Sequence, residues 1–461
     1  TSEVVLVGDT DSGDIPAPNG YDQTINGQTD IYVAKLSSAG NQLIWGTYIG
    51  GATIDDANAV ALDSLGNIIV AGNTESPDIP VPNGCCQSYF GARDIYLAKL
   101  SSSGDSIIWG TYVGGTGADE AYSLVISSLD SLIFAGSTNS SDIPVPNGYD
   151  QTYNSPGFGD IYVAKLSSSG DSLLWGTYIG GSYYEWAKCI GLDASNNILI
   201  AGTTASSDIP LLGGYDLSFN GGNDIYVAKL SFTGESLMWG TYIGGSMNDD
   251  PFSISLDSSS NLVIAGRTCS TDIPVPYGYD ETFNGGQYDI YVAKLSSSGN
   301  SLLWGTYIGG SGWDEAIALS LDSSDNVFLA GATSSVDIPV PNGYDQTLYE
   351  YANPIDIYVS KLESSGNSLL WGTYIGGNWG EEALGLSLDS SSNVVIVSFT
   401  NSIDIPVPNG YDQTFNSSSQ YDDDIYLAKL TQPVPCPDIV LSPEMLPSGT
   451  AGTDYSQTIS A

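Results

Sequence analysis

The chain has 461 residues, a formal net charge of -43 at pH 7 and an isoelectric point of about 4.1. The imbalance comes from a shortage of bases, because there are only 10 Lys and Arg and charged residues make up 14% of the chain. Phosphate backbones and anionic lipid repel such a protein, which argues against nucleic-acid binding. A hydrophobic content of 41% suffices for a large core. The chain contains no run of about 18 apolar residues, so the sequence predicts no membrane-spanning segment.

The first pattern along the chain is a strand, "EVVLVGDT" (residues 3–10), with no signal peptide before it. We interpret this opening as that of a processed or trimmed form of a longer chain. The triplet "DIP" then recurs at residues 14, 78, 142, 208, 272, 337 and 404, at intervals of 64 to 67 residues. A fixed period of this size indicates a propeller, a solenoid or an array of domains.

One complete repeat unit distinguishes among these architectures. It contains four strand-like runs, at 315–322, 326–333, 356–362 and 368–377. Short Ser/Asn/Gly turns and one long Pro/Gly/Asn loop separate the runs, and no segment has helical periodicity. Four such strands make an antiparallel meander, and radial repetition of that meander makes a β-propeller.

The number of strands predicts the number of blades. The second and third runs occur seven times, whereas the first and fourth occur six times. We therefore predict an all-β, seven-bladed propeller of four-stranded antiparallel blades over residues 1–430, with an extended tail over 431–461. The first blade would lack its inner strand and the last its outer strand. A vacant strand position exposes backbone groups to which another strand can add.

The phrase "DIYVAKLSSSGNSLLWGTYIGG" (289–310), followed by an acid pair, resembles the bacterial β-propeller repeat called SBBP, from about Val4 to Leu430. This resemblance implies a secreted or cell-surface protein, often part of a large multidomain chain. The stretch "LSPEMLPSGTAGTDYSQTISA" (441–461) is similar to the opening strands of bacterial Ig-like surface domains. It is too short to form a sandwich core of its own.

Seven of the ten basic residues occupy one position of the third strand: Lys35, Lys99, Lys165, Lys229, Lys294, Lys361 and Lys429. Blades pack on both faces, so we expect each ammonium to be half buried and to need a carboxylate partner. The predicted partners precede the inner strand: Asp55/Asp56, Asp119/Glu120, Glu185, Asp249/Asp250, Asp314/Glu315 and Glu381/Glu382. A lysine present in seven copies indicates a structural ring that sets how blades sit together, not catalysis.

The sequence offers little for catalysis. There is no histidine, and a sialidase-type arginine cluster is excluded because only Arg93 and Arg267 exist. The acid pairs would permit a glycosidase or lyase, but they recur with the blades and so indicate scaffold. We predict no catalytic residue and no cofactor. Oxygen-rich turns at 9–14 and 421–424 would suit Ca²⁺, yet match no defined calcium loop, and we favour solvated turns.

The long loops carry "PNGYDQT" in near-repeat and are the candidate interaction loops. Their Tyr–Asp pairs, expected on one face of the disc, are Tyr21/Asp22, Tyr149/Asp150, Tyr215/Asp216, Tyr279/Asp280, Tyr344/Asp345 and Tyr411/Asp412. Such pairs could stack on sugars or anchor their own loops, and we favour anchoring.

The second blade has Cys85–Cys86 where the other blades have the Tyr–Asp pair. We hypothesise a disulfide between Cys436 of the tail and one of these two, within a ring or between subunits. Cys189 and Cys269 read as isolated buried thiols.

Two functions are compatible with this organisation. The first is a non-catalytic extracellular structural protein, a subunit of a surface or filamentous assembly of its own copies. Head-to-tail donation of a tail strand, at 438–441 or 455–459, would join the copies. The alternative is a glycan- or protein-binding adhesion module of a larger surface protein. Both place the chain outside the cell or at its surface.

Overall fold

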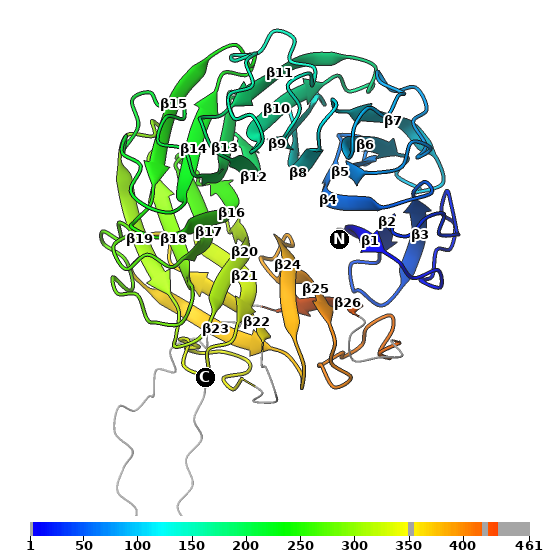
Figure 1. Ribbon diagram of the computed structural model, residues 1–461. Coiled ribbons are helices and arrows are strands. Elements are labelled where there is room, and N and C mark those ends of the chain that lie inside the picture. The colour runs from blue at the N-terminus through cyan, green and yellow to red at the C-terminus, as the bar shows by residue number, and fades with distance from the viewer. Residues whose placement is uncertain (1–2, 349–354, 417–422, 432–461) are drawn as a thin grey trace, which may run out of the picture.

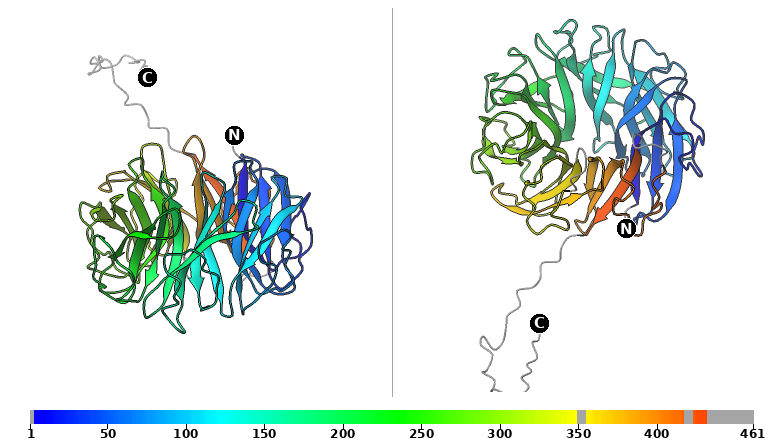
Figure 2. Two further views of the ribbon diagram at one scale, coloured as in Figure 1. Left: turned by 90° about the horizontal axis from the view of Figure 1, so that it is seen from above. Right: turned by 60° about the horizontal axis from the view of Figure 1, so that its bottom comes forward.

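The computed structural model describes residues 3–348, 355–416 and 423–431. Seven antiparallel sheets stand around a central axis (Figure 1), five with four strands and two with three. From the side the molecule is a short, wide disc (Figure 2). The predicted all-β, seven-bladed propeller is thus confirmed, including its incomplete first and last blades. Within the described ranges no helix is long and apolar enough to cross a membrane.

Blade 1 comprises β1–β3, blades 2 to 6 take four strands each from β4 to β23, and blade 7 comprises β24–β26. The inner strands, nearest the axis, are β4 (Asp55–Leu62), β8 (Asp119–Ile126), β12 (Glu185–Leu192), β16 (Asp249–Leu256), β20 (Asp314–Leu321) and β24 (Glu381–Leu388). The second strands are β1 (Val4–Thr10), β5 (Ile68–Thr74), β9 (Leu132–Thr138), β13 (Ile198–Thr204), β17 (Leu262–Thr268), β21 (Val327–Thr333) and β25 (Val394–Thr400).

The third strands all begin with aspartate: β2 (Asp30–Leu36), β6 (Asp94–Leu100), β10 (Asp160–Leu166), β14 (Asp224–Leu230), β18 (Asp289–Leu295), β22 (Asp356–Leu362) and β26 (Asp424–Leu430). The outer strands carry the Trp-Gly-Thr-Tyr pattern: β3 (Leu43–Ile49), β7 (Ile107–Val113), β11 (Leu173–Ile179), β15 (Leu237–Ile243), β19 (Leu302–Ile308) and β23 (Leu369–Ile375). The described strands end at Leu430, and the predicted tail lies outside the described residues except for Thr431.

Each blade has a turn side and a loop side. In a four-stranded blade the turn side carries two short turns, which in blade 2 are residues 63–67 and 101–106. The loop side carries the long loop and the link to the next inner strand. In the first turn, Asp63 Oδ1 accepts hydrogen bonds from the backbone N–H groups of Leu65 and Asn67 at 2.9 and 2.8 Å. This side-chain cap lets the inner strand reverse within a few residues.

The hydrophobic core lies between neighbouring blades. One cluster joins Ile31 and Val33 of blade 1 to Ile68, Val70 and Tyr96 of blade 2, and all five are 4% exposed or less. Full burial of one such aliphatic side chain stabilises the fold by about 1.5–3 kcal/mol. Both faces of a blade are buried in this way, so the strands read as nearly continuous apolar runs.

Blade 7 closes the ring on blade 1. Leu427 packs against the blade 1 cluster that includes Leu6 and Tyr32. The backbone N–H of Tyr411 donates to the carbonyl of Gly40 at 3.1 Å. The bond from Tyr21 N–H to the Gly104 carbonyl, at 2.9 Å, is its counterpart between blades 1 and 2.

The long loops cover the outer strands. In blade 1, Gly46 N–H donates to the Pro18 carbonyl at 3.1 Å, and Tyr48 N–H donates to the Asp22 carbonyl at 3.0 Å. The hydroxyl of Tyr32, from the third strand, donates to the Pro16 carbonyl at 2.6 Å and holds the loop from inside. The outer edge of the sheet is thereby protected from further pairing.

Candidate functional site

The lysine ring lies on the turn side of the disc, and its predicted partners are wrong. Lys99 Nζ lies 2.6 Å from Asp63 Oδ2, not near Asp55 or Asp56. The same pairing joins Lys229 to Asp193, Lys294 to Asp257, Lys361 to Asp322 and Lys429 to Asp389. The reason is topological: the third strand ends where the inner strand ends, whereas the acid pairs stand where the inner strand begins.

Two lysines depart from this pairing, and the sequence explains both. In blade 3 a serine, Ser127, replaces the aspartate, and Lys165 Nζ instead lies 3.2 Å from the centroid of the Phe232 ring. Burial without a carboxylate lowers the pKa of Lys165 to about 8. In blade 1 the described residues include no inner strand, and Lys35 Nζ contacts Glu3 at 2.5 Å.

The first acid of each pair is part of the scaffold. Asp55 Oδ2 accepts from Gly51 N–H at 2.7 Å and from Ser76 Oγ at 2.9 Å, while Oδ1 accepts from Thr74 Oγ1 at 2.5 Å. This carboxylate therefore joins the link from the preceding blade to the end of the second strand. Burial raises the pKa of these acids, to about 7 for Glu185 and for Asp249.

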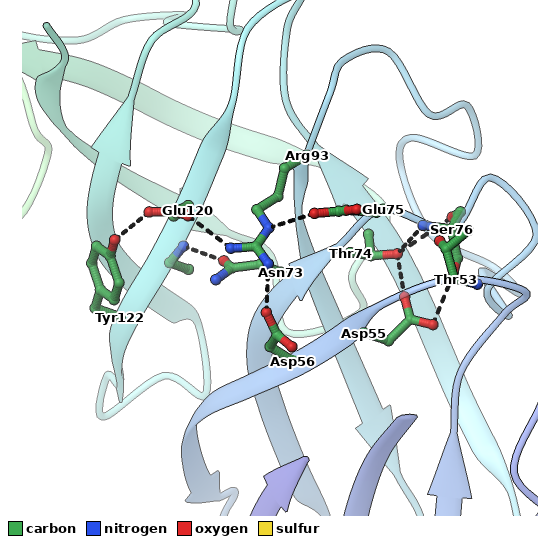
Figure 3. A network of polar contacts seen from close by, with 11 residues as sticks. Thr53, Asp55, Asp56, Asn73, Thr74, Glu75, Ser76, Arg93, Glu120 and Tyr122 are labelled. Atoms are coloured by element: carbon green, nitrogen blue, oxygen red, sulfur yellow. Dashed lines mark hydrogen bonds and ion pairs between the residues drawn. The ribbon is translucent and has the colours of Figure 1, made fainter. Parts of the chain in front are cut away.

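The second acids meet around the axis at the loop side, in a group we call the axial cluster: Asp56, Glu75, Arg93, Glu120, Tyr122, Lys188, Asp250, Arg267, Glu315 and Glu382. Figure 3 shows its first half, centred on Arg93. The Arg93 guanidinium lies 2.7 Å from Asp56, 3.0 Å from Glu120 and 3.5 Å from Glu75. The Tyr122 hydroxyl donates to Glu120 from the far side.

The second half of the axial cluster is centred on Arg267. Its guanidinium lies 3.2 Å from Asp250 and 2.9 Å from Glu315. Burial, opposed by Arg267 and reinforced by Glu382, raises the pKa of Glu315 to about 7.

Lys188 lies between the two halves, with its Nζ 4.7 Å from the Tyr122 ring centroid and 5.2 Å from that of Trp186. Reasoning from sequence missed this cluster, although a signal existed. Arg93, Lys188 and Arg267 are the three bases outside the lysine ring, and all three converge here. Both guanidinium groups are engaged by carboxylates of the chain, so the cluster ties inner strands together around the axis.

The Tyr–Asp pairs lie along the rim, because the loops run down the outer strands, and not on one face of the disc as expected. In the first blade the aspartate anchors its loop. Asp22 N–H donates to Thr47 Oγ1 at 2.9 Å, and Asp22 Oδ1 accepts from Thr24 N–H at 3.0 Å. The carboxylate is thus engaged by the loop that carries it, and the backbone of the same residue holds the loop to the outer strand.

The other aspartates of these pairs are engaged in the same way, as the favoured interpretation of the pairs as loop anchors expects. The backbone N–H groups of four of them donate to the threonine hydroxyl of the outer strand at 2.8 to 2.9 Å: Asp150, Asp216, Asp280 and Asp345. The Oδ1 atoms of the same four accept from the N–H two residues further on, at 2.8 to 3.0 Å. These four aspartates are half-buried loop anchors rather than groups presented to a partner.

The tyrosine side chains of the pairs point outward. Their exposed fractions run from 36% for Tyr215 to 76% for Tyr344. In each predicted pair the tyrosine side chain is therefore exposed for contact with a partner, whereas the aspartate holds its own loop in place.

The tryptophans of five of the six outer strands each pack against a turn glycine of the next blade. A Cβ atom on Gly104 would lie 2.4 Å from the Trp45 ring, and Gly170, Gly234, Gly299 and Gly366 meet Trp109, Trp175, Trp239 and Trp304 at similar distances. The sixth such turn, at Gly40, has nothing within 4 Å. Gly40 faces blade 7, where β26 pairs with β25 and no outer strand follows among the described residues.

The cysteine pair keeps the backbone role of the Tyr–Asp pair it replaces. Cys85 N–H donates to the Gly170 carbonyl at 2.9 Å, and Cys86 N–H donates to Thr111 Oγ1 at 3.0 Å. None of the four described cysteines, Cys85, Cys86, Cys189 and Cys269, forms a disulfide with another described residue. A hydrogen bond from Cys86 lowers the pKa of Cys85 to about 6. Cys436, the predicted disulfide partner, lies outside the described residues.

The two oxygen-rich turns offer no converging ligand set in the described part of the chain. Asp9 belongs to β1, and burial together with the nearby Asp56 raises its pKa. Residues 421 and 422 of the second turn lie outside the described residues. The preference for solvated turns over calcium sites therefore stays a prediction.

Comparison with known proteins supports the repeat architecture. Residues 44–80, from the outer strand of blade 1 to the second strand of blade 2 and just beyond, match the SBBP family model, described as "Beta-propeller repeat". An uncharacterized WD repeat-containing protein of Acanthamoeba polyphaga mimivirus is 22% identical over 449 residues, covering 80% of this chain and 32% of that protein. The regulatory protein FlaEY of Caulobacter vibrioides is 24% identical over 316 residues, covering 64% of this chain and 31% of that protein.

The chain thus spans about a third of the length of these curated relatives. Among solved structures, a protein of unknown function from Dyadobacter fermentans aligns with a TM-score of 0.43 and 11% identity, over 76% of this chain and 92% of that one. A quinohemoprotein alcohol dehydrogenase from Pseudomonas putida HK5 aligns with a TM-score of 0.37 and 9% identity, over 80% and 61%. Residues 44–80 carry a copy of the SBBP repeat, within a propeller whose seven blades share one strand pattern.

Proposed function

We propose that this chain is a non-catalytic propeller module that joins other polypeptides into an assembly outside the cell or at its surface. The recurring ionisable side chains support this proposal, because they contact groups of the propeller itself. The observation that carries it is the outer edge of β26, where the repeat is interrupted. Among the described residues β26 pairs with β25 alone, so its other edge can accept a partner strand.

Addition of a strand at this edge is the proposed mode of assembly. Ile425 is 49% exposed, whereas its counterparts in the other six blades are fully buried. A donor strand from another copy would bury this surface and extend the blade 7 sheet. Because donor and acceptor are different surfaces, the contact is head-to-tail, and it gives a filament when the rotation from copy to copy does not close into a ring. The first donor to test is residues 431–461 of a neighbouring copy.

Electron microscopy of the purified chain, with and without residues 431–461, tests this proposal. Filaments that disappear on deletion of the tail would establish head-to-tail strand donation. A Cys436→Ser variant serves as a matched control, since it removes the hypothesised disulfide and leaves the tail strands. Single discs from all three proteins would contradict self-assembly.

A second candidate function is glycan or protein binding through the rim. The exposed tyrosine side chains favour it, above all Tyr344, which is 76% exposed. A glycan array probed with the parent chain and with Tyr344→Ala and Tyr411→Ala would test it. Loss of a glycan signal with retained folding would favour adhesion, and absence of any signal would count against it.

A further inference from the structure

The strand that blade 7 accepts can be specified from the structure. This inference rests on the strand acceptance proposed above, and it names a different donor from the tail of a neighbouring copy. We infer that the open positions in blades 7 and 1 form one acceptor site for a single polypeptide segment of the repeat's own type. The segment is about 20 residues long, with a Trp-Gly-Thr-Tyr strand followed by a strand that begins with an acid pair.

At the outer position of blade 7, the space beside Gly40 has room for a tryptophan side chain. Five turn glycines each have an indole ring where a Cβ would stand, whereas Gly40 has open space. Lys429, which the missing strand would flank, has a side chain 37% exposed, compared with 11% for Lys99 and for Lys229. The space at Gly40 therefore fits an indole from a strand paired with β26.

The polar groups that such a strand needs are also in place. In blade 2, Thr111 Oγ1 accepts from the loop N–H of Cys86, and the Tyr112 hydroxyl donates to the Ser76 carbonyl at 2.9 Å. The corresponding groups in blade 7 are the Asp412 backbone and the Ser402 carbonyl. Asp412 Oδ1 accepts from Thr414 N–H at 2.9 Å, so the loop is shaped like those of the complete blades.

Blade 1 shows the matching features of a missing inner strand. Its Thr10 and Ser12 occupy the positions at which Thr74 and Ser76 clamp the first acid of the pair in blade 2. Ser12 N–H donates to Thr10 Oγ1 at 3.0 Å, and Ser76 N–H donates to Thr74 Oγ1 at 2.9 Å. The clamp of blade 1 is thus formed, and it lacks a carboxylate among the described residues. Lys35 contacts the half-exposed Glu3 where its counterparts contact the aspartate that follows the inner strand.

Chain order shows that the two positions belong to one segment. Throughout the propeller an outer strand continues through two glycines into the inner strand of the next blade, as β19 continues into β20. Blade 7 is followed by blade 1 in the ring, so its outer position and the inner position of blade 1 are the two halves of such a segment. The six segments of this kind in the chain occupy their own blades. Residues 432–461 contain no tryptophan, so the tail is not a segment of this type.

A synthetic peptide with the sequence of residues 301–322 is the probe, and its binding to the full chain is measured by fluorescence anisotropy. We expect saturable binding at one site per chain. Replacing Trp304 by Ala in the peptide should weaken binding roughly tenfold or more, because the indole fills the space at Gly40. The half-peptides 301–310 and 311–322 should each bind more weakly than the joined peptide by a similar factor.

A matched pair of chain variants locates the site. Gly40→Ala places a methyl group where the indole would sit, and it should weaken binding roughly tenfold or more. Gly66→Ala lies in another turn with a similar positive φ and nothing within 4 Å, so it should bind the peptide like the parent chain.

The outcomes separate this inference from the proposed function. Binding that neither Trp304→Ala nor Gly40→Ala weakens would overturn the inference. If the chain binds a peptide of residues 432–461 and does not bind the peptide of residues 301–322, the inference is also overturned. The proposal that blade 7 accepts a strand would then still hold. If neither peptide binds, both the inference and strand acceptance fail.

Discussion

Lys99 Nζ and Asp63 Oδ2 are 2.6 Å apart, at the end of blade 2 opposite the acid pair Asp55 and Asp56. The contact ties the end of the third strand to the turn that follows the inner strand, across the intervening second strand. Blades 4 to 7 repeat it. In these five blades the lysine therefore braces its own blade. Two lysines of the ring also reach the next blade, since Lys165 contacts the Phe232 ring of blade 4 and Lys294 donates to the Ser364 carbonyl of blade 6 at 3.0 Å.

Blade 3 tests the value of this brace, because Ser127 stands where the other blades have aspartate. Ser127→Asp should give Lys165 a carboxylate partner, raise the pKa of Lys165 from its lowered value, and increase the free energy of unfolding at pH 7 by about 1–2 kcal/mol. Urea denaturation checks this, with Ser127→Asn as the uncharged control. Equal midpoints for the two variants would contradict an ionic contribution.

The turn glycines separate backbone strain from steric overlap. Gly40 and Gly104 have φ values of 69° and 71°, but only Gly104 has an indole against its Cα. Gly40→Ala should cost about 1–2 kcal/mol, from the left-handed backbone alone. Gly104→Ala should cost about 1–3 kcal/mol more, because Trp45 must move. Thermal unfolding of the two variants gives the comparison, and similar losses would show that the Trp–Gly contact is loose.

Stability should fall as the pH rises from about 4 to 7. Burial raises the pKa of Glu185, Asp249 and Asp289 to about 7, so the folded state binds more protons than the unfolded state in this window. Below about pH 4 the opposite trend sets in, since hydrogen bonds and the lysine partners lower the pKa of the aspartates such as Asp63. Urea midpoints from pH 3 to 8 should therefore peak between about pH 4 and 5.

An Asp249→Asn variant identifies the source of this slope. It removes one proton-binding group and should flatten the decline between about pH 5 and 7, whatever its effect on absolute stability. A parent chain whose midpoint rises steadily from pH 5 to 8 would show that these carboxyl groups ionise in the fold at their usual pH.

Cys85 should be the most reactive of the four described thiols. Its pKa is lowered to about 6, whereas burial raises the pKa of Cys189 to about 12. At pH 7 iodoacetamide should modify Cys85 faster than Cys189 by roughly 100-fold or more, since the thiolate is the nucleophile. Mass spectrometry of timed samples measures both rates. Cys86→Ala should slow the reaction of Cys85 by removing its hydrogen-bond donor, and an unchanged rate would assign the reactivity to exposure alone.

The sequence by itself determined the architecture, because a propeller blade is a local structure. Each blade consists of consecutive strands, and its alternation and turn residues lie within one 64- to 67-residue repeat. The run predicted at 356–362 is β22 (Asp356–Leu362), and the run predicted at 315–322 is β20, displaced by one residue. Counting the runs was enough to predict seven blades and two vacant strand positions.

Only the tertiary structure decided which side chains meet. Lys99 pairs with Asp63 and not with Asp55 because antiparallel strands bring the end of the third strand to the end of the inner strand. The loops lie on the rim because their backbone groups bond to the outer strand. Arg93 meets Asp56 and Glu120 from two different inner strands. The contacts of Arg93 form where neighbouring blades converge on the axis. They depend on how the blades close into a ring, because no single repeat contains all the residues involved.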